Sequence, residues 1–291
     1  MIFMHIKERA LIFWSNPMKI LEKEVLSDYQ GTRVVRMKVF APHVAAKAKP
    51  GQFVALMVSE FGERIPLTIV ERDNESIIII FQEAGLTTKL LGKLNIGDSL
   101  YAIAGPLGHP TEIKNYGKVI IVGGGVGIAE IYPVARAFKE AGNHVTTILG
   151  ARTKGLLILE KELRSASNEI HVLTDDGSYS RKGFTTDALD ELLSKDKYGL
   201  VYSVGPIPMM KRVAQVTEKY GTFTIVSLNA IMVDATGMCG CCRVTVDGKT
   251  KFSCVDGPEF PAQAVDWDEL TKRNRVYEQK EKHLCNLNKI V

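Results

Sequence analysis

Four side chains in the last quarter of the chain have the types and spacing of metal ligands. Cys239, Cys242 and Cys254 follow one another as C-x2-C-x11-C, and Asp234 stands five residues before the first of them. Thiolates and carboxylates both bind metals. Nearby glycines let the backbone wrap closely around an inorganic group and point amides at sulfur. The segment therefore predicts a metal site with these four side chains as ligands.

The spacing favours a 2Fe-2S cluster. Plant-type clusters use C-x4-C-x2-C and a distant fourth cysteine, and Asp234 occupies the position of the first cysteine. A disulfide and a zinc site are the alternatives. No secretory signal supports a disulfide, and neither His283 nor Cys285 provides the second ligand pair that zinc would prefer. Cys241 is then expected to be a bystander, and Cys285, in a charged tail, a free thiol.

Length and composition describe an ordinary globular protein of two or three domains. Of 291 residues, 45% are hydrophobic and 24% charged, and the net charge is +4. Lysines and arginines are scattered, which disfavours nucleic acid as a partner. No apolar stretch reaches the roughly 20 residues of a membrane span, and residues 10–14 are too short for a signal core. We expect a cytoplasmic protein, with residues 1–17 as an extension outside the fold.

Residues 19–115 are predicted to form an antiparallel β-barrel. Short apolar runs are separated by glycine, proline and acidic turns. One helix is expected around 87–94. The expected strands include 34–39, 53–57, 77–81 and 99–103.

Residues 116–228 are predicted to form a Rossmann-like domain. Strand and helix patterns alternate there, which is typical of a doubly wound parallel sheet. The third segment, 229–291, holds the cysteine module and a polar tail that is expected to be helical from residue 267. The expected strands of the parallel sheet are 119–122, 145–149, 170–173, 200–203 and 223–226, with helices at 129–141, 185–194 and 207–220.

A glycine-rich turn follows the first strand of this sheet. Gly124, Gly125 and Gly127 could bring backbone amides close to a pyrophosphate, at the start of a helix that favours negative charge. The standard G-x-G-x-x-G fingerprint is not met, and many such junctions need glycine only for packing. The position of the turn, after the first parallel strand, favours nucleotide binding.

Other candidate contacts are weaker when taken singly. Gly205 and Pro206 form a second turn, for which a proline-initiated helix is an equally good explanation. An arginine beside a rigid proline and a hydroxyl suits phosphate binding, and a glycine followed by two threonines opens the helix near residue 87, where a simple N-cap is the alternative. These barrel residues are Arg64, Pro66, Leu67, Thr68, Gly85, Thr87 and Thr88.

The order of these motifs resembles the ferredoxin-NADP reductase superfamily. That superfamily has a flavin-binding R-x-x-S/T motif, a glycine-bearing turn, G-P-x-G, a G-x-G-x-A-P nucleotide turn and a late C-G-P. The corresponding segments here are 64–68, 85–88, 105–108 beginning with Gly105, 125–129 and 204–206. Glu130 stands where the family has proline, and Val204 where it has cysteine.

With its cysteine module, the span from 19 to about 265 is similar to the electron-transfer subunit of dihydroorotate dehydrogenase. Asp234 in the first ligand position resembles more closely the small subunit of NADH-dependent ferredoxin:NADP+ oxidoreductase, also called sulfide dehydrogenase subunit beta. The resemblance implies FAD in the barrel, NAD(H) on the Rossmann-like domain and a 2Fe-2S cluster. The cofactors would carry the chemistry, and no side chain is assigned as catalytic.

The resemblance also implies a partner. A larger subunit with a second FAD and 4Fe-4S clusters would form a heterodimer and couple NADH, NADPH and ferredoxin by flavin-based bifurcation. Dihydroorotate or sulfide dehydrogenase subunits, a self-contained NAD(P)H:acceptor reductase and a zinc-bearing regulator are the alternatives. The coenzyme stays open, because Arg152 and Lys154 could receive a 2'-phosphate that Asp175 and Asp176 would repel; the resemblance favours NAD(H).

Overall fold

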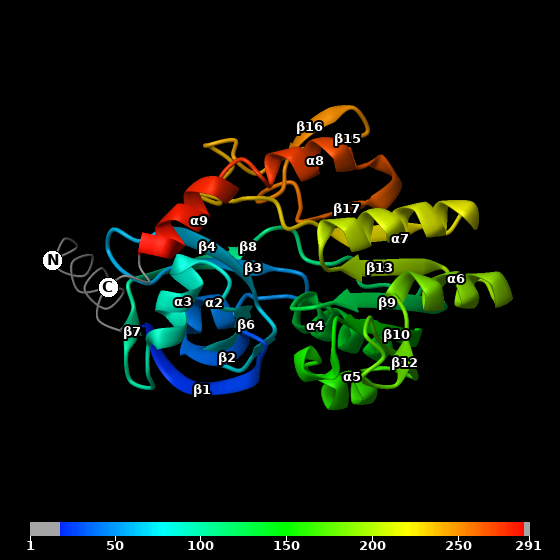
Figure 1. Ribbon diagram of the computed structural model, residues 1–291, viewed down its shortest axis with the longest axis horizontal. Helices are drawn as coiled ribbons and strands as arrows, with labels where there is room; N and C mark the ends of the chain where they lie inside the picture. Colours follow the sequence, from blue (N-terminus) through cyan, green and yellow to red (C-terminus); the bar gives the residue numbers. More distant parts are fainter. Residues whose placement is uncertain (1–17, 288–291) are drawn as a thin grey trace, which may run out of the picture.

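The computed structural model describes residues 18–287. A barrel unit lies beside a parallel-sheet unit, and the C-terminal segment lies over both (Figure 1). The barrel contains a five-stranded sheet in the order β5-β6-β2-β1-β7 and a three-stranded sheet in the order β4-β3-β8. Its elements are β1 (Met18–Tyr29), β2 (Thr32–Phe40), α2 (Pro42–Ala45), β3 (Phe53–Met57), β4 (Arg64–Thr68), β5 (Glu71–Arg72), β6 (Ser76–Gln82), α3 (Leu86–Lys93), β7 (Ser99–Leu100) and β8 (Ala102–Leu107).

Strand β6 is apolar on both faces because each face is buried. Ile77 and Ile79 point into the barrel core. Ile78 and Ile80 pack instead against the parallel-sheet unit, in one cluster with Ile128. Successive side chains of a strand point to opposite faces. The isoleucine run of this strand therefore joins the two units through a shared apolar contact.

The parallel-sheet unit confirms the predicted doubly wound architecture. Its strand order is β12-β11-β10-β9-β13-β14-β17, and only the last pairing is antiparallel. Alternate residues of β9 pack against α4 and α5 on one face and against α6 and α7 on the other. The elements are β9 (Lys118–Gly124), α4 (Gly127–Glu140), β10 (His144–Ala151), the 3-10 turn η1 (Lys154–Leu156), α5 (Glu160–Ala166), β11 (Glu169–Thr174), β12 (Arg181–Lys182), α6 (Thr185–Lys195), β13 (Leu200–Val204), α7 (Ile207–Lys219) and β14 (Thr224–Ser227).

The C-terminal segment is tied to both other units. Strand β17 extends the parallel sheet, and Phe53 of the barrel shares a core with Cys242, Cys254 and Trp267. Helix α9 reaches back over the barrel toward α3 (Figure 1). The segment with Cys242 and Cys254 is therefore packed against both other units. The elements are β15 (Arg243–Val246), β16 (Lys249–Phe252), β17 (Glu259–Pro261), the 3-10 turn η2 (Ala262–Ala264), α8 (Trp267–Arg273) and α9 (Glu278–Leu287).

The predicted strands and helices are present, with two differences. The strand expected over 99–103 is interrupted at Tyr101, so that β7 and β8 belong to different sheets. Helices α5, of seven residues, and α2, of four, were not predicted from the sequence. The predicted extension at 1–17 lies outside the described residues. Between residues 18 and 287, no helix is both long enough and apolar enough to span a membrane.

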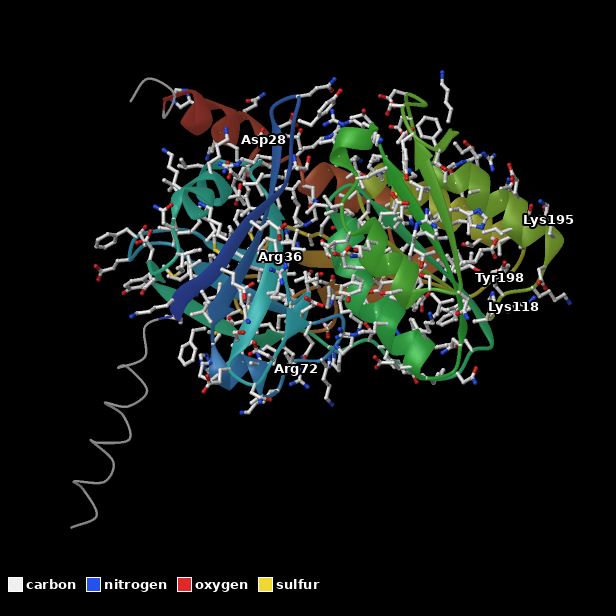
Figure 2. All side chains as sticks on the ribbon, turned by 90° about the horizontal axis from the view of Figure 1, so that it is seen from below. Asp28, Arg36, Arg72, Lys118, Lys195 and Tyr198 are labelled. Carbon is white, nitrogen blue, oxygen red and sulfur yellow. The ribbon has the colours of Figure 1, made fainter. Side chains whose placement is uncertain are left out.

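Charged side chains of both units project outward. Figure 2 shows Arg36 and Arg72 on the barrel, and Lys118, Lys195 and Tyr198 at the far end of the parallel-sheet unit. Arg36 pairs with Glu22, and Lys118 with Asp196, but these side chains are substantially exposed. Exposed pairs contribute little to stability. Each of these pairs lies within one unit, so neither links the two units.

Candidate cofactor-binding and electron-transfer site

The two glycine turns of the parallel-sheet unit lie side by side. Strands β9 and β13 are neighbours in register, with Val204 opposite Gly123, although 80 residues separate them in sequence. The strand order reverses between them, and ligands of doubly wound folds bind at such switch points. All five nucleotide-binding candidates border one cavity of about 880 Å³ there: Gly124, Gly125, Gly127, Gly205 and Pro206.

The opposite wall of this cavity comes from the barrel. Thr32 and Val34 of β2 and Gln82 of β6 face the glycine turns across it. Sequence reasoning missed these three residues, because nothing local marks a barrel strand that faces a second domain. It also missed Phe184, a 61% exposed aromatic ring at the cavity edge. The signal that could have indicated Phe184 is an aromatic side chain left exposed, and that exposure is visible only in the structure.

The glycines of the first turn are needed for different reasons. A Cβ on Gly127 would lie 2.7 Å from the carbonyl oxygen of Val204, so this glycine lets α4 approach β13. Gly125 has φ of +57° and no atom within 4 Å of an added Cβ. The sequence attributed both to space for a pyrophosphate. The structure gives Gly127 a packing reason and leaves Gly125 as the glycine whose open side faces the cavity.

Of the two basic residues expected to receive a 2'-phosphate, only one lies at the cavity edge. Arg152 and Asp175 line the cavity, and Arg152 donates a hydrogen bond to Thr32 at 3.4 Å. Lys154 does not line it: its ammonium lies 4.9 Å from the centre of the Tyr179 ring. Burial, and then the charge of Asp176, raises the pKa of Asp175. One cation and one carboxylate therefore lie where a coenzyme ribose would be discriminated.

Glu130, in the first turn of α4, also lines the cavity. Its carboxyl lies near Thr68 of β4, where the nucleotide turn meets the barrel. A helix N-terminus favours a charged carboxylate. Burial disfavours it, and burial prevails, since the pKa of Glu130 is raised to about 7. The sequence indicated this residue only as a departure from the family's proline.

The barrel candidates lie along the three-stranded sheet and at the start of α3. Strand β4, which carries four of them, and β8, which carries Gly105, pair with opposite edges of β3. The N-terminus of α3 is attached to β4 by the hydroxyl of Thr87, which donates to Glu63 at 2.7 Å. Thr88 bonds with the backbone of Gly85 and closes the helix start. Arg64 is exposed.

The four predicted metal ligands form two pairs. The thiols of Cys242 and Cys254 are 3.2 Å apart and buried. Asp234 accepts the backbone N–H of Cys239 at 3.0 Å and that of Thr236 at 2.9 Å. Burial, then the hydrogen bond with Cys242, raises the pKa of the Cys254 thiol to about 12, and the charge of Asp234 adds to the shift. The two pairs are therefore adjacent.

This arrangement fits a two-iron cluster better than a single ion. Among residues 18–287, no three His, Cys, Asp or Glu side chains converge as one metal ion requires. A two-iron cluster takes one ligand pair on each iron. Backbone N–H groups already point at sulfur, from Cys241 to Cys239 and from Cys254 to Cys242, each at 3.5 Å.

Cys241, expected to be a bystander, is held in the loop through its backbone. The carbonyl of Cys241 accepts a hydrogen bond from Arg273 at 3.1 Å, and its side chain is half-buried. The loop around it turns through left-handed backbone at Gly237 and Gly240, with φ of +84° and +66°. The side chain of Cys285, expected to be a free thiol, lies outside the described residues.

Comparison with known proteins agrees with these sites. Residues 229–266 match the iron-sulfur cluster binding domain of dihydroorotate dehydrogenase B, and residues 121–215 match an oxidoreductase NAD-binding domain. A Thermotoga maritima homolog of the dihydroorotate dehydrogenase B (NAD(+)) electron transfer subunit is 50% identical over 84% of this chain and 87% of its own.

Two solved structures extend the comparison. A chain from the structure of an NADH-dependent reduced ferredoxin-NADP oxidoreductase, studied for flavin-based electron bifurcation, is 44% identical with a TM-score of 0.87, covering 92% of this chain and 96% of its own. Ferredoxin-NADP+ reductase from Plasmodium falciparum, 14% identical with a TM-score of 0.57 over 70% of this chain and 90% of its own, shares the fold.

These findings confirm the expected cofactor types, namely flavin, an iron-sulfur cluster and NAD(H), and an NAD(P)H-linked oxidoreductase subunit. The subunit names of the relatives imply a larger partner. The chain belongs to the family of dihydroorotate dehydrogenase B electron-transfer subunits, built on the ferredoxin-NADP reductase fold.

Proposed function

We propose that this chain is the NADH-side electron-transfer subunit of a flavin-based bifurcating NADH-dependent ferredoxin:NADP+ oxidoreductase. The observation that carries the proposal is the cavity in which both nucleotide turns face the barrel. Such a cavity would let a nicotinamide approach a flavin held by the barrel. The cluster ligand pairs lie in a module packed on both units, which supports an onward route for electrons.

In this proposal the barrel holds FAD. Arg64 pairs with its phosphates, and Thr68 hydrogen bonds with its ring. The backbone N–H groups at the start of α3 would bind the pyrophosphate of FAD. When bound, the flavin accepts two electrons as hydride and releases them singly. The complete set of proposed FAD contacts is Arg64, Pro66, Leu67, Thr68, Gly85, Thr87, Thr88 and Gly105.

The glycine turns orient NAD(H) in the same proposal. The open side of Gly125 and the amides at the start of α4 face the cavity, where they suit a pyrophosphate. Gly205 and Pro206 hold the second turn beside them. Arg152 and Asp175 approach the ribose, and the carboxylate of Asp175 favours NADH over NADPH by repelling a 2'-phosphate.

Asp234, Cys239, Cys242 and Cys254 are the proposed 2Fe-2S ligands. The Asp234–Cys239 pair would hold the cluster from its exposed side and the Cys242–Cys254 pair from its buried side, since Cys239 is exposed while the other two thiols are not. A carboxylate donates less to iron than a thiolate, which sets the potential apart from an all-cysteine cluster.

The partner is proposed to dock over this loop. Met238 is 89% exposed and Val255 41%, and both lie beside proposed ligands. Exposed apolar side chains around a functional group are typical of protein interfaces. The partner would be a larger subunit with FAD and 4Fe-4S clusters, and it would exchange electrons with ferredoxin. A cytoplasmic location stays a prediction from the sequence.

The proposal is tested on the purified full chain. Iron and labile-sulfide assays, flavin content and the visible spectrum should give one FAD and one 2Fe-2S cluster per chain. Stopped-flow mixing with NADH should bleach flavin absorbance before a cluster paramagnetic signal appears. A colourless protein, or a cluster that dithionite reduces but NADH does not, would refute it.

The names of the relatives favour a second candidate, the electron-transfer subunit of a dihydroorotate dehydrogenase. The native complex discriminates between the two. NADH-dependent NADP+ reduction with reduced ferredoxin supports bifurcation, whereas dihydroorotate oxidation coupled to NAD+ supports the second candidate. Full turnover by the chain alone would contradict both, since both require a partner.

A further inference from the structure

A second cavity, of about 300 Å³, lies beside the predicted cluster ligands. It is lined by residues 239–241 of the ligand loop (234–242), by Arg243 at the start of β15 and by Arg273 at the end of α8. In the described part of the chain, this lining contains two guanidinium groups and no carboxylate. Arginines away from solvent are normally paired with an anion. The cavity therefore holds positive charge that no lining side chain neutralises.

Arg273 is the less exposed of the two arginines. It is half-buried, and its Nε is buried with no hydrogen-bond partner among residues 18–287. Its Nη2 donates to the carbonyl of Cys241 at 3.1 Å. That carbonyl belongs to the peptide unit that contains the N–H of Cys242, a proposed ligand. Arg273 therefore presents a charged donor to the backbone of the ligand loop.

Arg243 makes a similar but weaker contact. Its Nη1 donates to the carbonyl of Gly240 at 3.4 Å. The N–H of the same peptide unit is that of Cys241, which points at the sulfur of Cys239 at 3.5 Å. Arg243 is exposed. Since water and salt screen an exposed charge more than a partly buried one, Arg273 should have the larger effect on the loop.

The helix that carries Arg273 is held in place by its own contacts. The indole N–H of Trp267, in the first turn of α8, donates to the carbonyl of Ala262 at 3.0 Å and is buried. Asn274, directly after Arg273, donates to the carbonyl of Asn229 at 3.0 Å. Both ends of α8 are thus attached to the C-terminal segment. The position of the guanidinium is therefore set by the fold.

A two-iron cluster with three thiolates and one carboxylate is negatively charged, and reduction makes it more so. A nearby cation stabilises the reduced form more than the oxidised form. We propose that Arg273 is a positioning residue for the cluster: it holds the peptide between Cys241 and Cys242, and its charge raises the reduction potential of the cluster. This inference rests on the ligand set of the proposed function. Because a guanidinium stays protonated at working pH, the effect should not depend on pH.

The test uses the full chain with FAD and cluster bound. A redox titration of the paramagnetic signal of the cluster gives its midpoint potential. Arg273→Gln should lower the equilibrium constant for reduction about tenfold, which corresponds to about 59 mV for one electron. Arg273→Lys retains the charge and should recover most of this shift. Arg243→Gln should give a smaller shift in the same direction, because its charge is screened.

Arg275→Gln is the matched control. Arg275 is two residues beyond Arg273, is exposed and does not line the cavity. Its replacement removes the same charge and should leave the cluster potential unchanged. The flavin midpoint, followed by absorbance in the same titration, should be unchanged in every variant. The difference between Arg273→Gln and wild type should be the same at about pH 6.5 and about pH 8.5.

The outcomes are distinguishable. A wild-type chain without a two-iron cluster refutes the proposed function. A cluster whose potential is the same in Arg273→Gln as in wild type overturns the Arg273 inference alone, and so does an equal fall in Arg275→Gln. If Arg273→Gln does not hold a cluster, Arg273→Lys decides. A cluster at the wild-type potential in Arg273→Lys supports the role of the charge, whereas a lowered potential or no cluster overturns it.

Discussion

Replacing either glycine of the nucleotide turn with alanine should separate packing from ligand binding. At Gly127 the new Cβ would lie 2.7 Å from the carbonyl oxygen of Val204, which is 0.7 Å inside the 3.4 Å limit of ordinary contact, and 3.0 Å from the Cα of Gly205. These are backbone atoms, so α4 must shift away from β13. Overpacking of this kind costs about 1–3 kcal/mol. Alanine's better helix propensity returns at most about 1 kcal/mol.

We therefore expect Gly127→Ala to lose about 1–2 kcal/mol of unfolding free energy, which lowers Tm by about 2–8 °C. Gly125→Ala should instead weaken NADH binding about tenfold or more, since its Cβ enters the open side of the turn, with about 1 kcal/mol lost to left-handed strain. Calorimetry and NADH titration of bound flavin, with dithionite reduction as the control, measure both. If Gly127→Ala keeps full stability yet loses NADH reduction, the packing argument is wrong.

Three further predictions concern the other sites. Arg64→Ala should release FAD while cluster absorbance is retained; full flavin occupancy would remove this arginine from the site. Asp234→Cys should keep a 2Fe-2S centre with an altered potential and paramagnetic spectrum, whereas Cys241→Ser should be spectroscopically silent; the reverse pattern would make Cys241 the fourth ligand. Since folding raises the pKa of Glu130 from 4.5 to about 7, its stabilising contribution is full below pH 4.5 and lost as pH rises through 7. The urea midpoint of the nucleotide-free chain should fall between about pH 4.5 and pH 7, and Glu130→Gln should flatten that fall. An unchanged slope would contradict the shift.

Local sequence rules predicted most of the secondary structure because the signals are local. Alternation of buried residues in β2 and the apolar run of β9 follow from the faces that each strand covers. The prediction of one continuous strand over 99–103 was wrong. Its composition suits a strand throughout, and only the pairing of β7 with β1 and of β8 with β3 interrupts it at Tyr101.

The sequence by itself determined the chemistry of this protein. Cysteine spacing with Asp234, and glycine turns after parallel strands, are readable without a fold because ligand geometry and phosphate approach constrain residue type directly. It also gave the order of the units along the chain. The cluster was predicted from the cysteine spacing, and FAD and NAD(H) from the family resemblance that the order of the motifs carries.

Only the tertiary structure decided which residues meet. Glu130 and Thr68 are 62 positions apart, and their contact depends on how the barrel packs against the parallel sheet. The packing reason for Gly127 depends likewise on β13, which reaches the side of β9 only through the strand order. Burial, which sets the pKa of Glu130, is a property of the assembled units and has no local sequence signal.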